Sequence, residues 1–131
     1  MSKVVKVMGF GTFDGIHEGH LDFFRQLKAL GDKVYIVVAR DSNVERMKCR
    51  PPKHKERERY EALSKIKFID KVLLGHKDNF YQCIIDHKPD VIGLGYDQKA
   101  DTQILKLKFP HIRVVRLKPY QPEKYKSSLL K

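Results

Sequence analysis

Short continuous apolar runs alternate along this chain with segments in which apolar residues recur at helical spacing. Unbroken apolar runs are typical of parallel strands that are covered on both faces. Five such runs predict strands, at Lys3–Phe10, Val34–Ala39, Lys71–Gly75, Asp90–Gly95 and Ile112–Leu117.

Four of the segments between these strands have the periodicity of amphipathic helices. They span Gly19–Leu30, Glu56–Ile66, Asn79–His87 and about Lys99–Lys108. Gly31 would end the first helix, and Pro89 would end the third. The basic segment Arg40–Lys55 differs, because Pro51 and Pro52 would break any helix there, and no helix is predicted in it.

The regular alternation of strand and helix predicts the fold class. It indicates an α/β fold of the Rossmann-like type, in which a doubly wound parallel sheet of about five strands has right-handed crossovers. A length of 131 residues fits a single domain, 1–131. Such sheets bind ligands at the carboxyl ends of the strands, near the topological switch point. Candidate site segments are therefore Gly9–His20, Ala39–Arg50 and Gly95–Gln98.

Composition narrows the choice of partners and compartment. The formal net charge of +11 favours an anionic partner, either nucleic acid, an acidic membrane or phosphorylated small molecules, unless it reflects only a Lys- and Glu-rich surface. No run approaches the length of a membrane span, and no signal peptide is evident, so we expect a cytoplasmic protein. Cys49 and Cys83 have no zinc spacing and are expected to be free thiols.

The turn after the first strand contains the candidate chemistry. A dinucleotide-binding G-x-G-x-x-G would need glycine where Asp14 stands, and a P-loop lysine is absent. His17 and His20 instead lie three residues apart at the start of a helix, with Gly19 between them. Helix N-termini attract phosphate, and two imidazoles can stabilise charge that develops on phosphorus. This arrangement suits in-line attack on a nucleotide α-phosphate, with pyrophosphate as the leaving group.

Gly11-Thr12-Phe13-Asp14 followed by His17-Glu18-Gly19-His20 resembles the signature of the HxGH nucleotidylyltransferases, the cytidylyltransferase-like superfamily. The segment Lys126–Lys131 is similar to a second signature of that superfamily. Within it the chain looks most like archaeal FAD synthases, on Ala39–Ser42, Lys48–Arg50, Leu73–Gly75 and Pro89–Gln98. The resemblance therefore implies transfer of AMP from ATP to FMN.

The resemblance also implies roles for individual residues. His17, His20 and Lys48 would be catalytic, the last on substrate phosphates. One of Arg57 and Arg59 would serve the site, and Asp14 is interpreted as a turn residue. His54, His76, His87 and His111 match no motif and are expected on the surface. The nucleotide would be bound by Gly11, Thr12, Phe13, His17, Glu18, Gly19, His20, Asp97, Tyr125, Lys126, Ser127 and Ser128.

Other functions stay open at this stage. Glycerol-3-phosphate cytidylyltransferases share much of the middle segment, although their arginine-bearing ending is replaced here by Tyr125–Leu129. A nucleic-acid-binding module and a dinucleotide-binding oxidoreductase that uses Asp41 on a ribose are weaker alternatives. Either transferase implies a divalent cation, with Mg²⁺ held through the nucleotide phosphates because no carboxylate cage is evident. No nucleic-acid or membrane partner is expected, and the resemblance suggests a homodimer.

Overall fold

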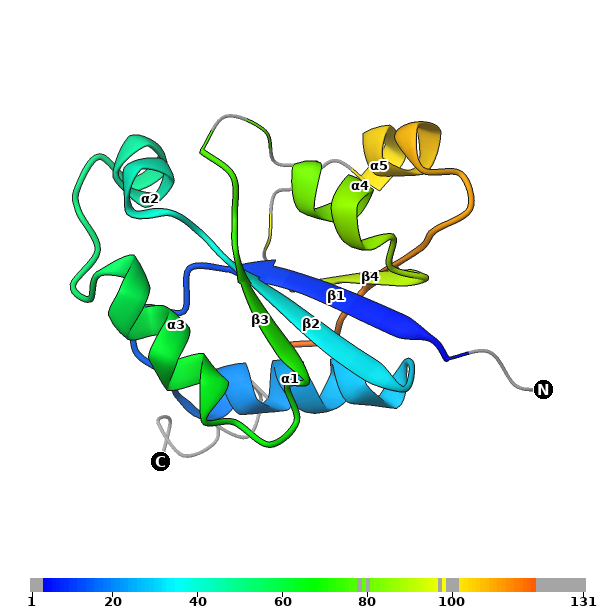
Figure 1. The fold of residues 1–131 in the computed structure, drawn as a ribbon, viewed down its shortest axis with the longest axis horizontal. Coiled ribbons are helices and arrows are strands. Elements are labelled where there is room, and N and C mark those ends of the chain that lie inside the picture. The colour runs from blue at the N-terminus through cyan, green and yellow to red at the C-terminus, as the bar shows by residue number, and fades with distance from the viewer. Residues whose placement is uncertain (1–3, 78, 80, 97, 99–101, 120–131) are drawn as a thin grey trace, which may run out of the picture.

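The computed structural model describes residues 4–77, 79, 81–96, 98 and 102–119, which form an α/β fold around one sheet (Figure 1). The strands are β1 (Lys6–Gly11), β2 (Lys33–Val38), β3 (Lys71–Leu74), β4 (Val91–Leu94) and β5 (Arg113–Arg116). Their order is β3-β2-β1-β4-β5, and every neighbouring pair is parallel. The predicted doubly wound parallel sheet is confirmed.

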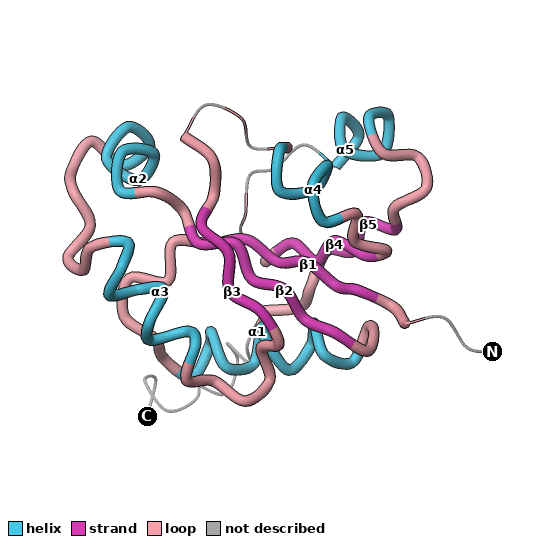
Figure 2. The backbone as a smooth tube through the Cα atoms, in the orientation of Figure 1, coloured by secondary structure: helices cyan, strands magenta, loops and turns pink. Residues whose placement is uncertain are grey.

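Helices cover both faces of this sheet (Figures 1 and 2). One face is covered by α1 (Glu18–Ala29) and α3 (Glu56–Ser64), and the other by α4 (Gln82–His87) and α5 (Thr102–Lys108). The remaining helix, α2 (Asp41–Lys48), lies beyond the carboxyl end of β2. None of these described helices is long and apolar enough to cross a membrane.

The two covered faces explain why the strands are continuously apolar. Successive strand residues point to opposite faces. In β1, Val7 packs in the cluster that contains Phe24 and Leu27 of α1, whereas Met8 packs in the cluster that contains Ile84 of α4. Because each face has its own core, neither side of a central strand has room for a polar residue.

Two glycines of the sheet let α1 approach closely. A Cβ at Gly9 would lie 2.7 Å from Leu27 Cδ1, and one at Gly93 would also collide with the Leu27 side chain. The two glycines are partners in the β1–β4 register, so they form one flat surface at the centre of the sheet. This surface fixes the position of α1 relative to the end of β1.

The helix α2 departs from the sequence-based prediction, which placed no helix between residues 40 and 55. Pro51 and Pro52 follow α2 instead of preventing it, because the helix has already ended at Lys48. Cys49 takes a left-handed conformation there, with φ at 58°, and turns the chain out of the helix.

The start of α2 is stabilised by tertiary contacts that a local pattern does not reveal. Its N-cap residue, Arg40, makes no side-chain cap hydrogen bond. Glu56 of α3 takes over this role by accepting hydrogen bonds from Asp41 N at 2.9 Å and from Arg40 Nη1 at 2.8 Å. The hydrogen bond from Asp41 N, together with the Arg40 guanidinium, outweighs partial burial and lowers the pKa of Glu56.

The other elements differ from prediction mainly at their ends. The strand predicted over Lys3–Phe10 is observed as Lys6–Gly11, and the helix predicted from Asn79 begins at Gln82. The helix predicted from about Lys99 is described from Thr102, and residues 99–101 lie outside the described part. The predicted wrapping of the tail over the site concerns residues 120–131, which also lie outside it.

Candidate active site

The turn between β1 and α1 lies at the topological switch point of the sheet. β1 has β2 on one side and β4 on the other. The chain leaving β1 enters α1 on one face, whereas the chain leaving β4 leads to α5 on the opposite face. In parallel α/β sheets this divergence marks the ligand site. Three segments were predicted to face a ligand: Gly9–His20, Ala39–Arg50 and Gly95–Gln98. They meet at the end of β1, where Gln98 Nε2 donates to Phe10 O and Ala39 N donates to Gly11 O.

His17 and His20 cap α1 reciprocally. His17 is the N-cap residue, and its Nδ1 accepts a hydrogen bond from Gly19 N at 3.0 Å. In return, His20 Nδ1 accepts one from His17 N at 3.2 Å. The two rings stack with centroids 3.8 Å apart and an interplanar angle of 26°. The histidine pair is thus part of the helix terminus itself.

These hydrogen bonds assign the tautomer of both rings. A nitrogen that accepts from a backbone N–H carries no proton, so a neutral ring must carry its proton on Nε2. Each ring then presents an Nε2–H donor.

The backbone N–H groups at the start of α1 are also engaged within the turn. Gly19 N donates to the His17 ring, while His20 N and Leu21 N donate to His17 O at 3.0 and 3.1 Å. A phosphate at this terminus would therefore meet the ring Nε2–H groups and the positive end of the helix dipole, not these three amides.

The Phe13 ring packs against the ring of His20. Its side chain is buried, and its ring meets the His20 ring edge-on with centroids 5.4 Å apart. The ring packs over Gly11, where a Cβ would lie 2.6 Å from Phe13 Cζ, so only glycine fits at that position. Phe13 has φ at 54°, a conformation that non-glycine residues rarely adopt. With its side chain in the core, the predicted contact of Phe13 with a nucleotide would have to come from its backbone.

Asp14 anchors the same turn to the loop before α3. Its carboxylate accepts hydrogen bonds from Lys53 N at 2.6 Å and His54 N at 2.8 Å, and pairs with His54 Nδ1 at 2.9 Å. Desolvation raises the pKa of Asp14, but these hydrogen bonds outweigh it and bring the pKa to about 2. These contacts agree with the interpretation of Asp14 as a turn residue. They also give a partner to His54, which was expected to be an ordinary surface histidine.

Arg59 and Arg57 have opposite environments. Arg57 has a side chain that is 90% exposed and pairs with Glu61. Arg59 is only 2% exposed, and among the described residues it is the one buried charged side chain. Its guanidinium donates to Thr12 O and Ala39 O, each at 2.8 Å, from the same Nη1.

The rest of the Arg59 guanidinium is also bonded. Nε donates to His54 O at 3.0 Å, and Nη2 pairs with Asp41 at 2.6 Å. Sequence reasoning considered Asp41 only as a ribose ligand of an oxidoreductase; here its carboxylate is the partner of a buried arginine. No local pattern marked this pair, because eighteen positions separate the two residues.

Gln98 connects the ends of β1 and β4. Its Oε1 accepts a hydrogen bond from Gly95 N at 2.7 Å, and its Nε2 donates to Phe10 O at 2.6 Å. Arg116 closes the same corner by donating to Gly95 O at 2.9 Å and Gln98 O at 2.6 Å. The predicted segment Gly95–Gln98 contained the glutamine but did not distinguish it from its neighbours.

Comparison with known proteins places this turn in a family. The model of the family described as "Cytidylyltransferase-like" matches residues 8–131. The chain belongs to the cytidylyltransferase-like family. It is 42% identical to the FAD synthase of Aciduliprofundum boonei, over 89% of this chain and 80% of that protein. It is 39% identical to the FAD synthase of Thermoplasma acidophilum, over 98% of this chain and 92% of that protein.

A solved structure supports the same assignment of fold. The crystal structure of the lipopolysaccharide core biosynthesis protein from Thermoplasma volcanium GSS1 superposes with a TM-score of 0.86 at 36% identity. The match covers 91% of this chain and all of that one. The chain is accordingly a nucleotidyltransferase with a Rossmann-like fold, as the first signature of the cytidylyltransferase-like family predicted.

Several predicted residues of the cytidylyltransferase-like site stay predictions. Lys48 is exposed at the end of α2, and its role on substrate phosphates is untested. Glu18 is exposed in the first turn of α1, beside the histidine pair. The predicted nucleotide ligands Asp97, Tyr125, Lys126, Ser127 and Ser128 lie outside the described residues.

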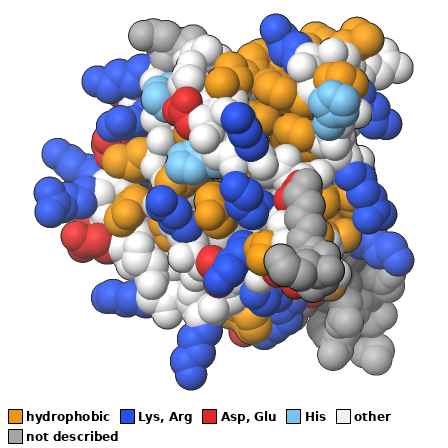
Figure 3. Space-filling model, turned by 45° about the vertical axis from the view of Figure 1, so that its right-hand side comes forward, with side chains coloured by type: hydrophobic (Ala, Val, Ile, Leu, Met, Phe, Trp, Pro, Cys, Tyr) orange, Lys and Arg blue, Asp and Glu red, His pale blue; other side chains and the backbone are white. Residues whose placement is uncertain are grey.

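The face of the molecule shown in Figure 3 gives no support to the alternative of a nucleic-acid-binding module. Lys and Arg side chains are spread around the face shown in Figure 3 and are interrupted by acidic and apolar side chains. A nucleic-acid-binding surface would instead gather its positive charge in one stripe or patch.

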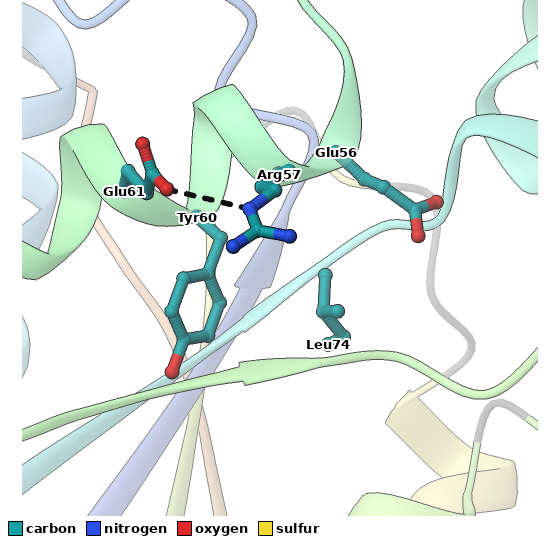
Figure 4. Close-up of a pocket in the computed structure, with 5 residues that line it drawn as sticks. All are labelled: Glu56, Arg57, Tyr60, Glu61 and Leu74. Atoms are coloured by element: carbon teal, nitrogen blue, oxygen red, sulfur yellow. Dashed lines mark hydrogen bonds and ion pairs between the residues drawn. The ribbon is translucent and has the colours of Figure 1, made fainter.

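A hollow of about 360 Å³ lies between α3 and β3 (Figure 4). Its described lining residues are Glu56, Arg57, Tyr60, Glu61 and Leu74. None of them belongs to the histidine turn, and Arg57 and Glu61 pair with each other along α3 at 3.5 Å. The hollow is therefore separate from the candidate active site.

Proposed function

We propose that the chain is a FAD synthase, which transfers the AMP moiety of ATP to FMN and releases pyrophosphate. The observation that carries the choice of acceptor is the identity of 36–46% to FAD synthases from several archaea. The histidine turn supports transfer from an α-phosphate but does not by itself select FMN.

The geometry suits an in-line displacement at the α-phosphorus. A phosphate oxygen of FMN forms the new bond to phosphorus, while the bond from phosphorus to the bridging oxygen of pyrophosphate breaks. Charge accumulates on the phosphoryl oxygens during this step. The Nε2–H groups of His17 and His20, at the positive end of α1, would stabilise that charge. The protein would thus contribute positioning and electrostatics and would need no side-chain nucleophile.

A divalent cation is expected with the nucleotide, because Mg²⁺ would offset charge on the leaving pyrophosphate. In the part of the chain that the structure describes, no three His, Cys, Asp or Glu side chains are grouped to hold a metal ion. The Asp14 carboxylate of the turn is already bound to Lys53 N, His54 N and His54 Nδ1. We therefore expect phosphates and water to supply most of its ligands. The homodimer and the cytoplasmic location stay predictions.

The assignment is tested by product analysis. The protein is incubated with ATP, FMN and Mg²⁺, and in parallel with CTP, glycerol 3-phosphate and Mg²⁺, and products are separated by chromatography. The proposal predicts FAD in the first reaction and no CDP-glycerol in the second. CDP-glycerol without FAD would replace it with the glycerol-3-phosphate cytidylyltransferase alternative.

A further inference from the structure

We propose that Arg59 is a positioning residue for the transfer reaction, and that it acts on His20 through the backbone of the β1–α1 turn. The inference rests on the proposed function for its kinetic consequence only. The structural part concerns the histidine turn itself and can be tested whether or not FMN is the acceptor.

Arg59 connects the ends of β1 and β2 through hydrogen bonds. Thr12 directly follows β1 and Ala39 directly follows β2, and both carbonyls accept from the same Arg59 nitrogen at 2.8 Å. Ala39 N also donates to Gly11 O at 2.9 Å. The guanidinium therefore sets how far the chain leaving β1 can move from the chain leaving β2 at the edge where the site lies.

Arg59 also binds His54, the residue to which Asp14 of the turn is bound. Its Nε binds His54 O, while the backbone N–H of the same residue, His54, binds the Asp14 carboxylate. The turn is thus held at Thr12 by Arg59 directly and at Asp14 through His54. Phe13 lies between these two attachment points. Arg59 therefore holds the turn on both sides of Phe13.

Phe13 connects these attachments to the histidine pair, because its ring contacts the ring of His20. Phe13 has φ at 54°, a left-handed conformation that is unfavourable for an aromatic residue and persists only where its surroundings enforce it. The attachments on either side of Phe13 provide that enforcement. The Phe13 ring, held in this way, meets the His20 ring edge-on. A change at Arg59 therefore reaches His20 without any contact between the two side chains.

Burial makes this arrangement specific to arginine. A buried cation needs partners for its donors, and Arg59 has the Asp41 carboxylate on one side and carbonyls on the others. Lysine could satisfy one or two of these acceptors but cannot span all four, because its ammonium is a compact point charge. We therefore expect Arg59→Lys to fold while leaving the turn incompletely held.

The test compares Arg59→Lys and Arg59→Met with Arg57→Met, which removes an exposed arginine from the same helix. Activity is expressed per folded protein, from circular dichroism at a temperature well below each melting transition. We expect Arg59→Lys to lower kcat for FAD formation about 100-fold, as for a misplacement of roughly 1 Å, with KM for FMN changed less than threefold. Arg57→Met should stay within twofold of the unchanged protein. A purely structural role predicts normal kcat per folded molecule, and that result would overturn the proposal.

A second readout does not depend on activity. Long-range ¹H–¹⁵N spectra of the protein should show His20 as a single Nε2–H tautomer, and Arg59→Lys should shift it toward a mixture of tautomers. Retention of the single tautomer in Arg59→Lys would contradict the proposal even if activity fell. A protein that makes no FAD but loses the tautomer on substitution would refute the proposed function and leave the positioning role intact. If Arg59→Met does not fold, the lysine variant decides both readouts.

Discussion

His17 and His20 each accept a backbone hydrogen bond of the same turn through Nδ1, so the two rings that would act on a phosphate also terminate the helix that carries them. A substitution that removes a ring would therefore change both stability and chemistry. The two effects can be separated, because they belong to different ring nitrogens: Nδ1 accepts from the backbone of the turn, and Nε2 would donate to the phosphate in the proposed reaction.

Substitution of His17 should separate capping from catalysis. In His17→Asn the amide oxygen can still accept from the start of the helix, but no donor replaces Nε2–H. We expect the free energy of unfolding to change by less than about 0.5 kcal/mol while kcat falls about 10²–10³-fold. His17→Ala should lose similar activity and a further ~1 kcal/mol of stability. Urea unfolding and initial rates measure the two quantities.

His111→Ala provides the control for these variants, since His111 is exposed and lies far along the chain from the turn. It should leave both quantities unchanged. Normal kcat in His17→Asn would show that Nε2 of this residue does not act on the substrate.

Asp14 should make stability depend on pH in acid. The pKa of Asp14 is about 2 in the folded chain, below the 3.8 of an unperturbed aspartate, so the unfolded chain binds the proton more tightly. The stabilisation is therefore present above pH 3.8 and is lost as the pH falls toward 2. Asp14→Asn should lower the free energy of unfolding by roughly 1–2 kcal/mol at pH 6, and the difference should shrink toward pH 2.

The measurement is urea unfolding of both proteins across this pH range. Glu61→Gln removes a carboxylate whose side chain is 62% exposed and provides a control with little effect. A constant difference between Asp14→Asn and the unchanged chain at all pH values would contradict the assignment.

Glu56 should control the stability of α2. This helix has no side-chain N-cap, and Glu56 supplies the acceptor for Asp41 N and the partner of Arg40. We expect Glu56→Ala to raise the hydrogen-exchange rates of the α2 amides about tenfold or more, because a lost cap and a part-buried ion pair together contribute about 1–2 kcal/mol. Exchange in β1 and β4 should change much less.

Glu61→Ala removes a different carboxylate from α3 and serves as the control. It should leave hydrogen exchange in α2 unchanged. Equal acceleration throughout the sheet would mean that Glu56 stabilises the whole domain and not the start of α2.

The sheet could be predicted because each strand repeats one simple requirement. Val7 and Met8 face different cores, so both must be apolar, and the same holds for the neighbouring strands. The histidine pair could be found for a similar reason: its members lie three residues apart, within one helical turn. Features whose partners are near in sequence leave a readable pattern.

The residues that hold the site together left no such pattern. Arg59 meets Thr12 from 47 positions away, and Gln98 meets Phe10 from 88. A charged residue in a helix that begins Glu-Arg-Glu-Arg resembles surface, and nothing local distinguishes Arg59 from Arg57. The helix α2 was missed for the same reason, since its stabilising acceptor comes from α3. Prediction from sequence therefore reached the groups that would do the chemistry. Of the residues that position them, the family resemblance indicated only that one of Arg57 and Arg59 serves the site, without choosing between the two.

We infer that this chain transfers the α-phosphoryl group of ATP, with its adenosine, to FMN. The most direct measurement follows radioactive phosphorus from ATP labelled at the α or the γ position, in the presence of FMN and Mg²⁺. We expect α-label in FAD and γ-label in the released pyrophosphate but not on the flavin, and we expect His17→Asn to lower the rate of α-label transfer about 10²–10³-fold. Label from the γ position on the flavin, or no label on the flavin from either position, would contradict it.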